Sequence, residues 1–183
     1  YGARISTVLL DPDAGPADGL NKGFAAARGQ IYGYINADDL LLPGALACVA
    51  GHFAARPDVD VILGNGLLID DHDQVRRRVQ SSRFSLAAFG HGAMTFLQQG
   101  NFFRDTAFAR AGGFNIANRT SWDAELLVDM ARSGARVANV ADRLGGFRLY
   151  ADTITGSGRL AAAMRIDKAR IAAKALGRPP AAY

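Results

Sequence analysis

Two adjacent carboxylates, Asp38 and Asp39, follow a short apolar run and are well placed to do chemistry. The run 29–35 is rich in aromatic and β-branched residues and predicts a buried strand that ends at the two carboxylates. Ligands bind at that edge of an open parallel α/β sheet. Adjacent like charges need a cation, a donor group or water, so the pair is a candidate site for a hard divalent metal. The alternative is that Asp39 caps a helix near Pro43 while Asp38 is solvated.

A third carboxylate, Asp123, lies in the first turn of a predicted helix over 122–132. The spacing of Leu126, Leu127 and Met130 is that of an amphipathic helix, and Gly134 follows its end. An acidic side chain in the first turn stabilises the helix dipole, which is one sufficient explanation of its position. From the residues alone, a structural role and a chemical role for Asp123 both stay open.

Strand and helix patterns around these carboxylates predict a mixed, mostly parallel α/β sheet flanked by helices. Strands are predicted at 5–10, 29–35, 59–64, 94–103, 137–140 and 144–150, with a hairpin from 67–69 to 75–79. Helices are predicted from about Asp18 to before Gly29, and at 44–55, 122–132 and 159–177.

Composition places the chain in the globular class. It has 183 residues, of which 49% are hydrophobic, and no apolar run reaches the length of a membrane span. The single cysteine, Cys48, cannot form an internal disulfide, which fits a reducing compartment. The chain opens at Tyr1 within what resembles a domain, so we expect a fragment of a longer protein.

The net charge of +4 suits an anionic partner such as a nucleotide diphosphate, a nucleic acid or a membrane surface. The basic run 76–78 lies in a predicted strand without interleaved aromatics, which argues for a solvated face and against a nucleic-acid site. The predicted helix 159–177 has a thin apolar stripe, so packing on the domain is favoured over binding to an anionic membrane.

Several ordered motifs resemble family 2 glycosyltransferases of the GT-A fold. The first half of the resemblance comprises Asp13 to Gly23, Ala27 to Asp39, and Pro43. The second half comprises Gln99 to Arg104, Gly112-Gly113-Phe114 and Asp123-Ala124-Glu125-Leu126. Together they cover most of 5–150 in the family's order, which is more specific than the paired carboxylates alone.

The resemblance implies a nucleotide-diphosphate-sugar donor and a saccharide, lipid-linked or other hydroxyl acceptor. Mg²⁺ or Mn²⁺ would bridge the diphosphate to Asp38 and Asp39 in the segment Asn36-Ala37-Asp38-Asp39. Asp123 matches the family's general base for single displacement with inversion. The implied donor contacts are Asp18, Asn21, Lys22, Asn36 and Arg148.

The chain also departs from the family pattern. Asn36 stands where many members have Asp, and Tyr150 stands near the place of a histidine that can complete the metal site. The family's first strands, which form much of the nucleoside pocket, would lie before Tyr1. These departures keep a non-catalytic sugar- or nucleotide-binding module as the alternative. A metal-dependent phosphotransferase is disfavoured because no Gly-rich phosphate loop with a Lys is present.

We therefore expect a partial GT-A-like glycosyltransferase domain over 1–158 and a C-terminal helix and tail over 159–183. The expected location is the cytoplasm, or the inner face of the membrane by peripheral association.

Overall fold

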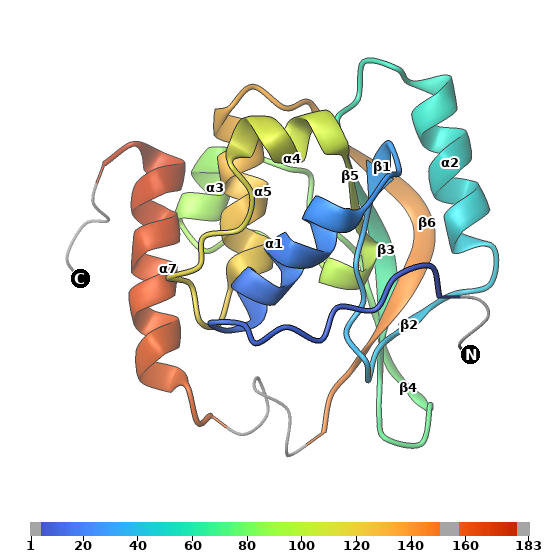
Figure 1. Ribbon diagram of the computed structural model, residues 1–183, viewed down its shortest axis with the longest axis horizontal. Helices are drawn as coiled ribbons and strands as arrows, with labels where there is room; N and C mark the ends of the chain where they lie inside the picture. The colour runs from blue at the N-terminus through green and yellow to red at the C-terminus, as the bar shows by residue number, and fades with distance from the viewer. Residues whose placement is uncertain (1–4, 151–157, 179–183) are drawn as a thin grey trace.

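A six-stranded mixed sheet forms the centre of the computed structural model, which describes residues 5–150 and 158–178. The strand order is β1-β5-β3-β6-β2, and β4 pairs with β3 off this path (Figure 1). The strands are β1 (Ile31–Tyr32), β2 (Leu40–Leu41), β3 (Val61–Ile69), β4 (Val75–Val79), β5 (Asn101–Arg104) and β6 (Val137–Arg148).

The sheet is mixed, as expected, but the expectation that it is mostly parallel is wrong. Among the described residues, β3 and β6 are the only strands that pair in parallel. The pairs β1–β5, β2–β6, β3–β4 and β3–β5 are antiparallel. A hydrophobic run indicates a strand but not the direction of its neighbour, which is decided by long-range contacts.

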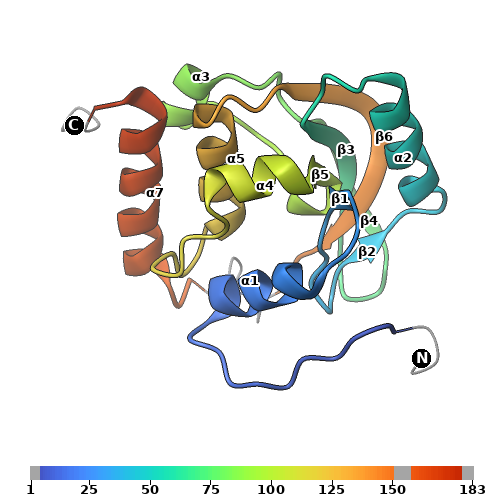
Figure 2. The same ribbon diagram turned by 45° about the horizontal axis from the view of Figure 1, so that its top comes forward.

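Helices cover both faces of this sheet (Figure 2). They are α1 (Pro16–Ala26), α2 (Ala45–Ala55), α3 (Leu86–Gly90), α4 (Asp105–Ala111), α5 (Trp122–Arg132) and α7 (Ala161–Leu176), with a 3-10 turn η2 (Gln98–Gly100). On one face, side chains of β3 and β5 pack with α1, α4 and α5. On the other face, Ile62 and Phe102 pack with α2. No helix in the described part of the chain has both the length and the apolar character of a bilayer span.

An aromatic cluster joins α1 to the sheet. The Phe24 ring centroid lies 4.8 Å from that of Tyr32 and 5.8 Å from those of Phe103 and Phe114. Tyr34, just beyond β1, packs edge-on against Phe114 at 5.6 Å. Such aromatic pairs add to the free energy of burial. They hold the segment after β1, which leads to Asp38, against α1.

The outermost helix, α7, packs against α5 and α3 rather than on the sheet (Figures 1 and 2). Ile171 and Ala175 of α7 are buried against Val128 of α5. The expected terminal helix is therefore present, and it packs on the domain.

Several predicted elements are confirmed. The hairpin joins β3 to β4, and α5 has the predicted bounds of 122–132. Both elements depend on local patterns of apolar residues and turn residues, which are readable without knowledge of distant contacts.

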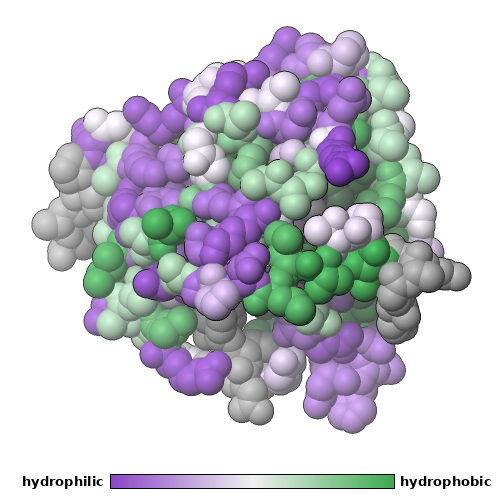
Figure 3. Space-filling model, in the orientation of Figure 1, coloured by the Kyte–Doolittle hydropathy of each residue, from purple (hydrophilic) through white to green (hydrophobic). Residues whose placement is uncertain are grey.

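Other boundaries are wrong. Residues 5–10 lie extended and exposed without forming a strand, because a strand needs a ladder partner and none pairs with them in the described chain. Figure 3 shows apolar side chains gathered where this segment crosses the surface; Val8 and Leu10 are 65% and 88% exposed. The strands expected at 29–35 and 94–103 shorten to β1 and β5. The two expected closing strands form one strand, β6, and the short elements α3, α4 and β2 were missed.

Candidate functional site

A cleft of about 480 Å³ lies between the end of the β1 segment and the start of α5. Three of the predicted site residues line it: Asn36, Asp38 and Asp123. The remaining lining residues are Pro16, Tyr34, Phe96, Leu97, Gln98, Gln99, Thr120, Trp122 and Phe147. A concave site with an apolar wall and a few convergent polar groups is the usual form of a small-molecule site.

The adjacent carboxylates have different surroundings. Asp39 accepts three hydrogen bonds: one at Oδ1 from the Arg148 backbone amide (2.8 Å), and two at Oδ2 from Gln99 Nε2 (2.6 Å) and Asn36 Nδ2 (2.9 Å). Asp38 lines the cleft, and its Oδ2 accepts a long hydrogen bond from the Tyr150 hydroxyl at 3.4 Å. Asp39 therefore orders the loop that presents Asp38.

Each nitrogen of the Arg148 guanidinium donates a hydrogen bond near this loop. Nε donates to the Asp38 carbonyl at 2.7 Å, Nη1 donates to the Asp70 carbonyl at 2.6 Å, and Nη2 donates to Asp73 Oδ1 at 2.6 Å. The hydrogen bond that Arg148 donates to Asp73 raises the pKa of Arg148, and burial opposes this shift. Arg148 thus ties the Asp38 loop to the turn between β3 and β4.

Asp123 enters the cleft from the first turn of α5 and is partly buried. Burial raises the pKa of its carboxyl above the usual 3.8, against hydrogen bonds from backbone amides at the helix start. Beside it, Trp122 Nε1 donates to the Tyr34 hydroxyl at 3.1 Å. Burial and the Asp123 charge raise the pKa of Tyr34, so Tyr34 stays protonated. A carboxylate with a raised pKa in a partly dry site is suited to accept a proton.

Two buried glutamines join the sides of the cleft. Gln98 Nε2 donates to the Tyr34 carbonyl at 2.5 Å, and Gln99 Nε2 donates to Asp39 at 2.6 Å. Both acceptors can only accept, which fixes the orientation of the two amides. The 3-10 turn η2 therefore fastens both Tyr34 and the Asp39 loop.

The predicted donor contacts on α1 have other partners. Asp18 accepts from the Ala14 amide at 2.9 Å and from Lys22 at 3.0 Å, and these bonds lower the pKa of Asp18. Asn21 exchanges two hydrogen bonds of 2.9 Å with the backbone of Phe114. Of α1, the cleft lining includes Pro16. The structure therefore does not gather Asp18, Asn21 and Lys22 with Asp38 and Asp123.

Sequence reasoning missed Tyr34, Gln98, Thr120 and Trp122 as cleft residues. Trp122 carried a usable signal, because it is the only tryptophan and precedes Asp123. Tyr34 lay inside a predicted strand, where a core role was the simplest interpretation. No local signal marks Gln98 or Thr120.

The donor groups at Asp38 fit a divalent cation only in a shared site. Within the described residues, groups of three metal-ligating side chains occur at Cys48-His52-Asp142 and at Asp70-Asp71-His72, and neither includes Asp38 or Asp39. Because Asp39 is already hydrogen bonded, Asp38 is the carboxylate open to an ion. Mg²⁺ is commonly held by one or two carboxylates together with substrate phosphates and water.

Two solved structures are similar to this chain in fold. The crystal structure of S. aureus TarS has a TM-score of 0.60 at 16% identity, over 90% of this chain and 31% of that chain. The structure of S. aureus TarS 1-349 in complex with UDP-GlcNAc has a TM-score of 0.62 at 14% identity, over 92% of this chain and 54% of that chain. At such identities the likeness shows the fold alone. The fold is that of the GT-A glycosyltransferases.

The family follows from the sequence comparison. The model described as "Glycosyl transferase family 2" matches residues 3–127, and the chain belongs to this family. The O-antigen biosynthesis protein RfbC of Myxococcus xanthus is 38% identical over 60 residues, which is 33% of this chain and 5% of RfbC. The chain thus spans a small part of RfbC and, at 31% to 54%, a third to about half of the TarS chains.

Proposed function

We propose that this chain carries the reaction centre of an inverting glycosyltransferase that moves a sugar from a nucleotide-diphosphate sugar to a hydroxyl acceptor. The observation that carries the proposal is that Asp38 and Asp123, far apart in sequence, line one cleft. A binding module would not require both carboxylates to face the same space. The raised pKa of Asp123 and its place on a rigid helix support its role as the base.

In the proposed reaction, the acceptor oxygen attacks the anomeric carbon from the face opposite the diphosphate. Asp123 takes the hydroxyl proton as the new carbon–oxygen bond forms. The bond from the anomeric carbon to the diphosphate breaks, and its electron pair leaves with the nucleoside diphosphate. One base and one displacement give inversion at that carbon.

A divalent cation, when bound, would neutralise the charge that develops on the departing diphosphate. We assign Asp38 as its protein ligand, because Asp39 already accepts three hydrogen bonds. Asp39 and Arg148 then hold the loop of Asp38 in place, rather than contacting metal or phosphate. Mg²⁺ and Mn²⁺ both suit a carboxylate and phosphate donor set.

Of the donor contacts that the resemblance implies, Asn36 keeps this role in the proposal because it lines the cleft. Asp18, Asn21 and Lys22 support α1 through the hydrogen bonds described above. Two of the neighbouring TarS structures are complexes, one with UDP-GlcNAc and one with UDP, so UDP-sugars are the donors to test first. The printed name of RfbC favours an acceptor in polysaccharide biosynthesis.

The alternative is a sugar- or nucleotide-binding module without turnover. The neutral Asn36 and the hydroxyl of Tyr150 beside Asp38 favour it, because both reduce the negative charge available to a cation. Such a module would bind a nucleotide sugar but would not need Asp123.

Calorimetric titration of UDP and other nucleoside diphosphates with Mg²⁺ or Mn²⁺ tests the donor site. We expect binding that requires the metal and that Asp38→Asn abolishes. Release of UDP from the UDP-sugar that binds, with water as acceptor, then tests turnover. Turnover lost in Asp123→Asn while binding is retained supports the enzyme; binding without turnover in either protein favours the module. If no nucleotide binds, the assignment of the donor site is wrong.

A further inference from the structure

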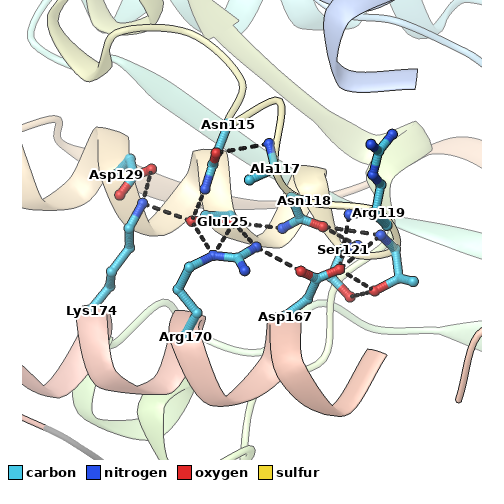
Figure 4. Close-up of polar contacts among 11 residues, drawn as sticks. Asn115, Ala117, Asn118, Arg119, Ser121, Glu125, Asp129, Asp167, Arg170 and Lys174 are labelled. Atoms are coloured by element: carbon cyan, nitrogen blue, oxygen red, sulfur yellow. Dashed lines mark hydrogen bonds and ion pairs between the residues drawn. The ribbon is translucent and has the colours of Figure 1, made fainter. Parts of the chain in front are cut away.

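A buried group of charges joins α7 to the first turns of α5 on the side away from the sheet (Figure 4). At its centre, the Glu125 carboxylate has no exposed surface. It accepts from Arg170 Nη2 at 2.8 Å and Nε at 3.0 Å, and Lys174 Nζ lies 2.7 Å away. Both cations come from α7. Asn115 and Asn118, which precede α5, also donate to Glu125 at 2.9 and 2.6 Å.

The same helix holds the chain that enters α5. Asp167, which is 2% exposed, accepts hydrogen bonds of 3.0 Å from the backbone amides of Arg119 and Thr120. It also accepts from the Thr120 hydroxyl at 2.8 Å and from Arg170 at 2.7 Å. Figure 4 shows Asp167, Arg170 and Lys174 projecting from one side of α7 toward this segment.

The segment that α7 holds also forms part of the cleft wall. Thr120, Trp122 and Asp123 line the cleft, and Glu125 lies two residues after Asp123 on α5. The cluster holds the backbone amides of Arg119 and Thr120 before Asp123 and the side chain of Glu125 after it. A shift of α7 would therefore move Asp123 relative to Asp38, whose carbonyl is held separately by Arg148 Nε.

We propose that Arg170 is a positioning residue for Asp123, acting through Glu125, and that α7 is part of the reaction centre's support. Lys174 and Asp167 act with it at the two ends of the cluster. This inference rests on the proposed function, in which Asp123 is the base.

The chemistry of the cluster favours positioning over simple adhesion. Apolar contacts such as Ile171 on Val128 already bury α7 against α5. Apolar packing is non-directional, whereas a two-nitrogen contact from Arg to a carboxylate fixes distance and orientation. Buried ion pairs often add little net stability compared with apolar replacements, but they can specify one arrangement. Misplacement of a catalytic group by about 1 Å can cost on the order of 100-fold in rate.

The test compares Arg170→Met and Arg170→Lys with a matched control, Lys168→Met, at an exposed position of the same helix. Arg170→Lys keeps the charge but loses the fork geometry. Three quantities are measured: the folded fraction by thermal unfolding, amide hydrogen exchange in 118–124, and UDP release from a UDP-sugar per folded molecule. UDP affinity is measured in parallel, because the Asp38 side of the cleft should be unaffected.

We expect Arg170→Met to lower UDP release per folded molecule by roughly 10- to 100-fold, with UDP affinity unchanged and exchange in 118–124 accelerated. Arg170→Lys should show a smaller change in the same direction, and Lys168→Met should match the parent protein. If Arg170→Met does not fold, Arg170→Lys decides the question.

A merely structural role predicts a different result. If the Arg170 variants lose only folded fraction, with turnover per folded molecule and exchange in 118–124 unchanged, the positioning proposal is overturned. The Asp123→Asn variant distinguishes this result from failure of the proposed function. Full turnover in that variant would show that Asp123 is not the base. Hydrogen exchange in 118–124 would then be the measurement that decides whether Arg170 orders this segment.

Discussion

Two hydrogen bonds, both donated by Arg148, join it to the adjacent residues Asp38 and Asp39. Asp39 Oδ1 accepts from the Arg148 backbone amide at 2.8 Å, while Arg148 Nε donates to the carbonyl of the preceding Asp38 at 2.7 Å. The loop after β1 is thus fastened to the last residue of β6 from both sides. These bonds leave the Asp38 side chain at the cleft, so Asp39 holds the loop while Asp38 faces the cleft.

Asp39→Asn should therefore mainly lower stability, whereas Asp38→Asn should mainly remove binding. An amide at 39 must turn its NH₂ group toward at least one present donor, either the Arg148 amide or the amides of Gln99 and Asn36, so we expect a loss of about 1–3 kcal/mol in the free energy of unfolding. Asp38→Asn should change that free energy by less than about 0.5 kcal/mol and abolish metal-dependent UDP binding. Urea denaturation and calorimetry measure the two effects. Equal loss of stability in both variants would contradict the separation of tasks.

Mg²⁺ and nucleotide should bind cooperatively. A single carboxylate supplies too few ligands for the near-octahedral site that Mg²⁺ demands, so we expect no saturable Mg²⁺ binding at Asp38 without UDP. With UDP present, the diphosphate supplies further oxygens, and each ligand should tighten the other by the same factor. Calorimetry in both orders of addition measures this factor. Tight Mg²⁺ binding without UDP that Asp38→Asn removes would show a complete metal site and disprove the prediction.

The raised pKa of Asp123 predicts effects on both rate and stability. Turnover needs the ionised carboxylate, so the rate should fall as pH decreases through a pKa above 3.8. Because burial disfavours the charge, stability should decrease as pH rises from 3.8 through that raised pKa.

Asp123→Asn should remove the loss of stability that comes from burying this charge. We expect it to be inactive yet more stable than the parent protein at pH 7, with the difference vanishing below pH 3.8. Unfolding measured across pH checks this prediction. A variant that is less stable at pH 7 would mean that the charge of Asp123 is compensated in the folded protein.

Glu125 should have the opposite pH dependence. Burial alone would raise its pKa, but hydrogen bonds from Arg170, Lys174, Asn115 and Asn118 outweigh burial and lower the pKa from 4.5 to about 2. A lowered pKa means that the stabilisation is complete above pH 4.5 and is lost as pH falls toward about 2. Glu125→Gln should cost about 3 kcal/mol at pH 7, because it leaves Arg170 and Lys174 without their buried partner.

Acid titration of stability distinguishes Glu125 from other carboxylates. The gap in unfolding free energy between the parent and Glu125→Gln should narrow as pH falls from 4.5 toward 2. Asp142→Asn provides a comparison of the same sign but smaller size, since the hydrogen bond from His52 also lowers the pKa of Asp142, and Asp142 is exposed. A gap that stays constant with pH would mean that Glu125 acts through packing rather than charge.

The sequence by itself determined the elements and residues whose signals are local. The helix α5 was readable to its exact bounds because the apolar spacing from Leu126 to Met130 and the following Gly134 are features of one short stretch. The β3–β4 hairpin was readable for the same reason. The ordered motifs indicated the family, and they drew attention to Asp38 and Asp123 before any geometry was known.

Only the tertiary structure decided how these residues are used. Asp38 and Asp39 are indistinguishable in sequence, and they differ because Gln99 and Arg148 approach Asp39 from distant parts of the chain. Arg148, Asn21 and Lys22 were expected at the donor because cations and amides suit phosphate and sugar, yet their hydrogen bonds go to backbone and carboxylate groups elsewhere. A hydrogen bond is satisfied by whichever partner folding brings within reach, and that partner is set by long-range packing, which residue type and local spacing do not encode.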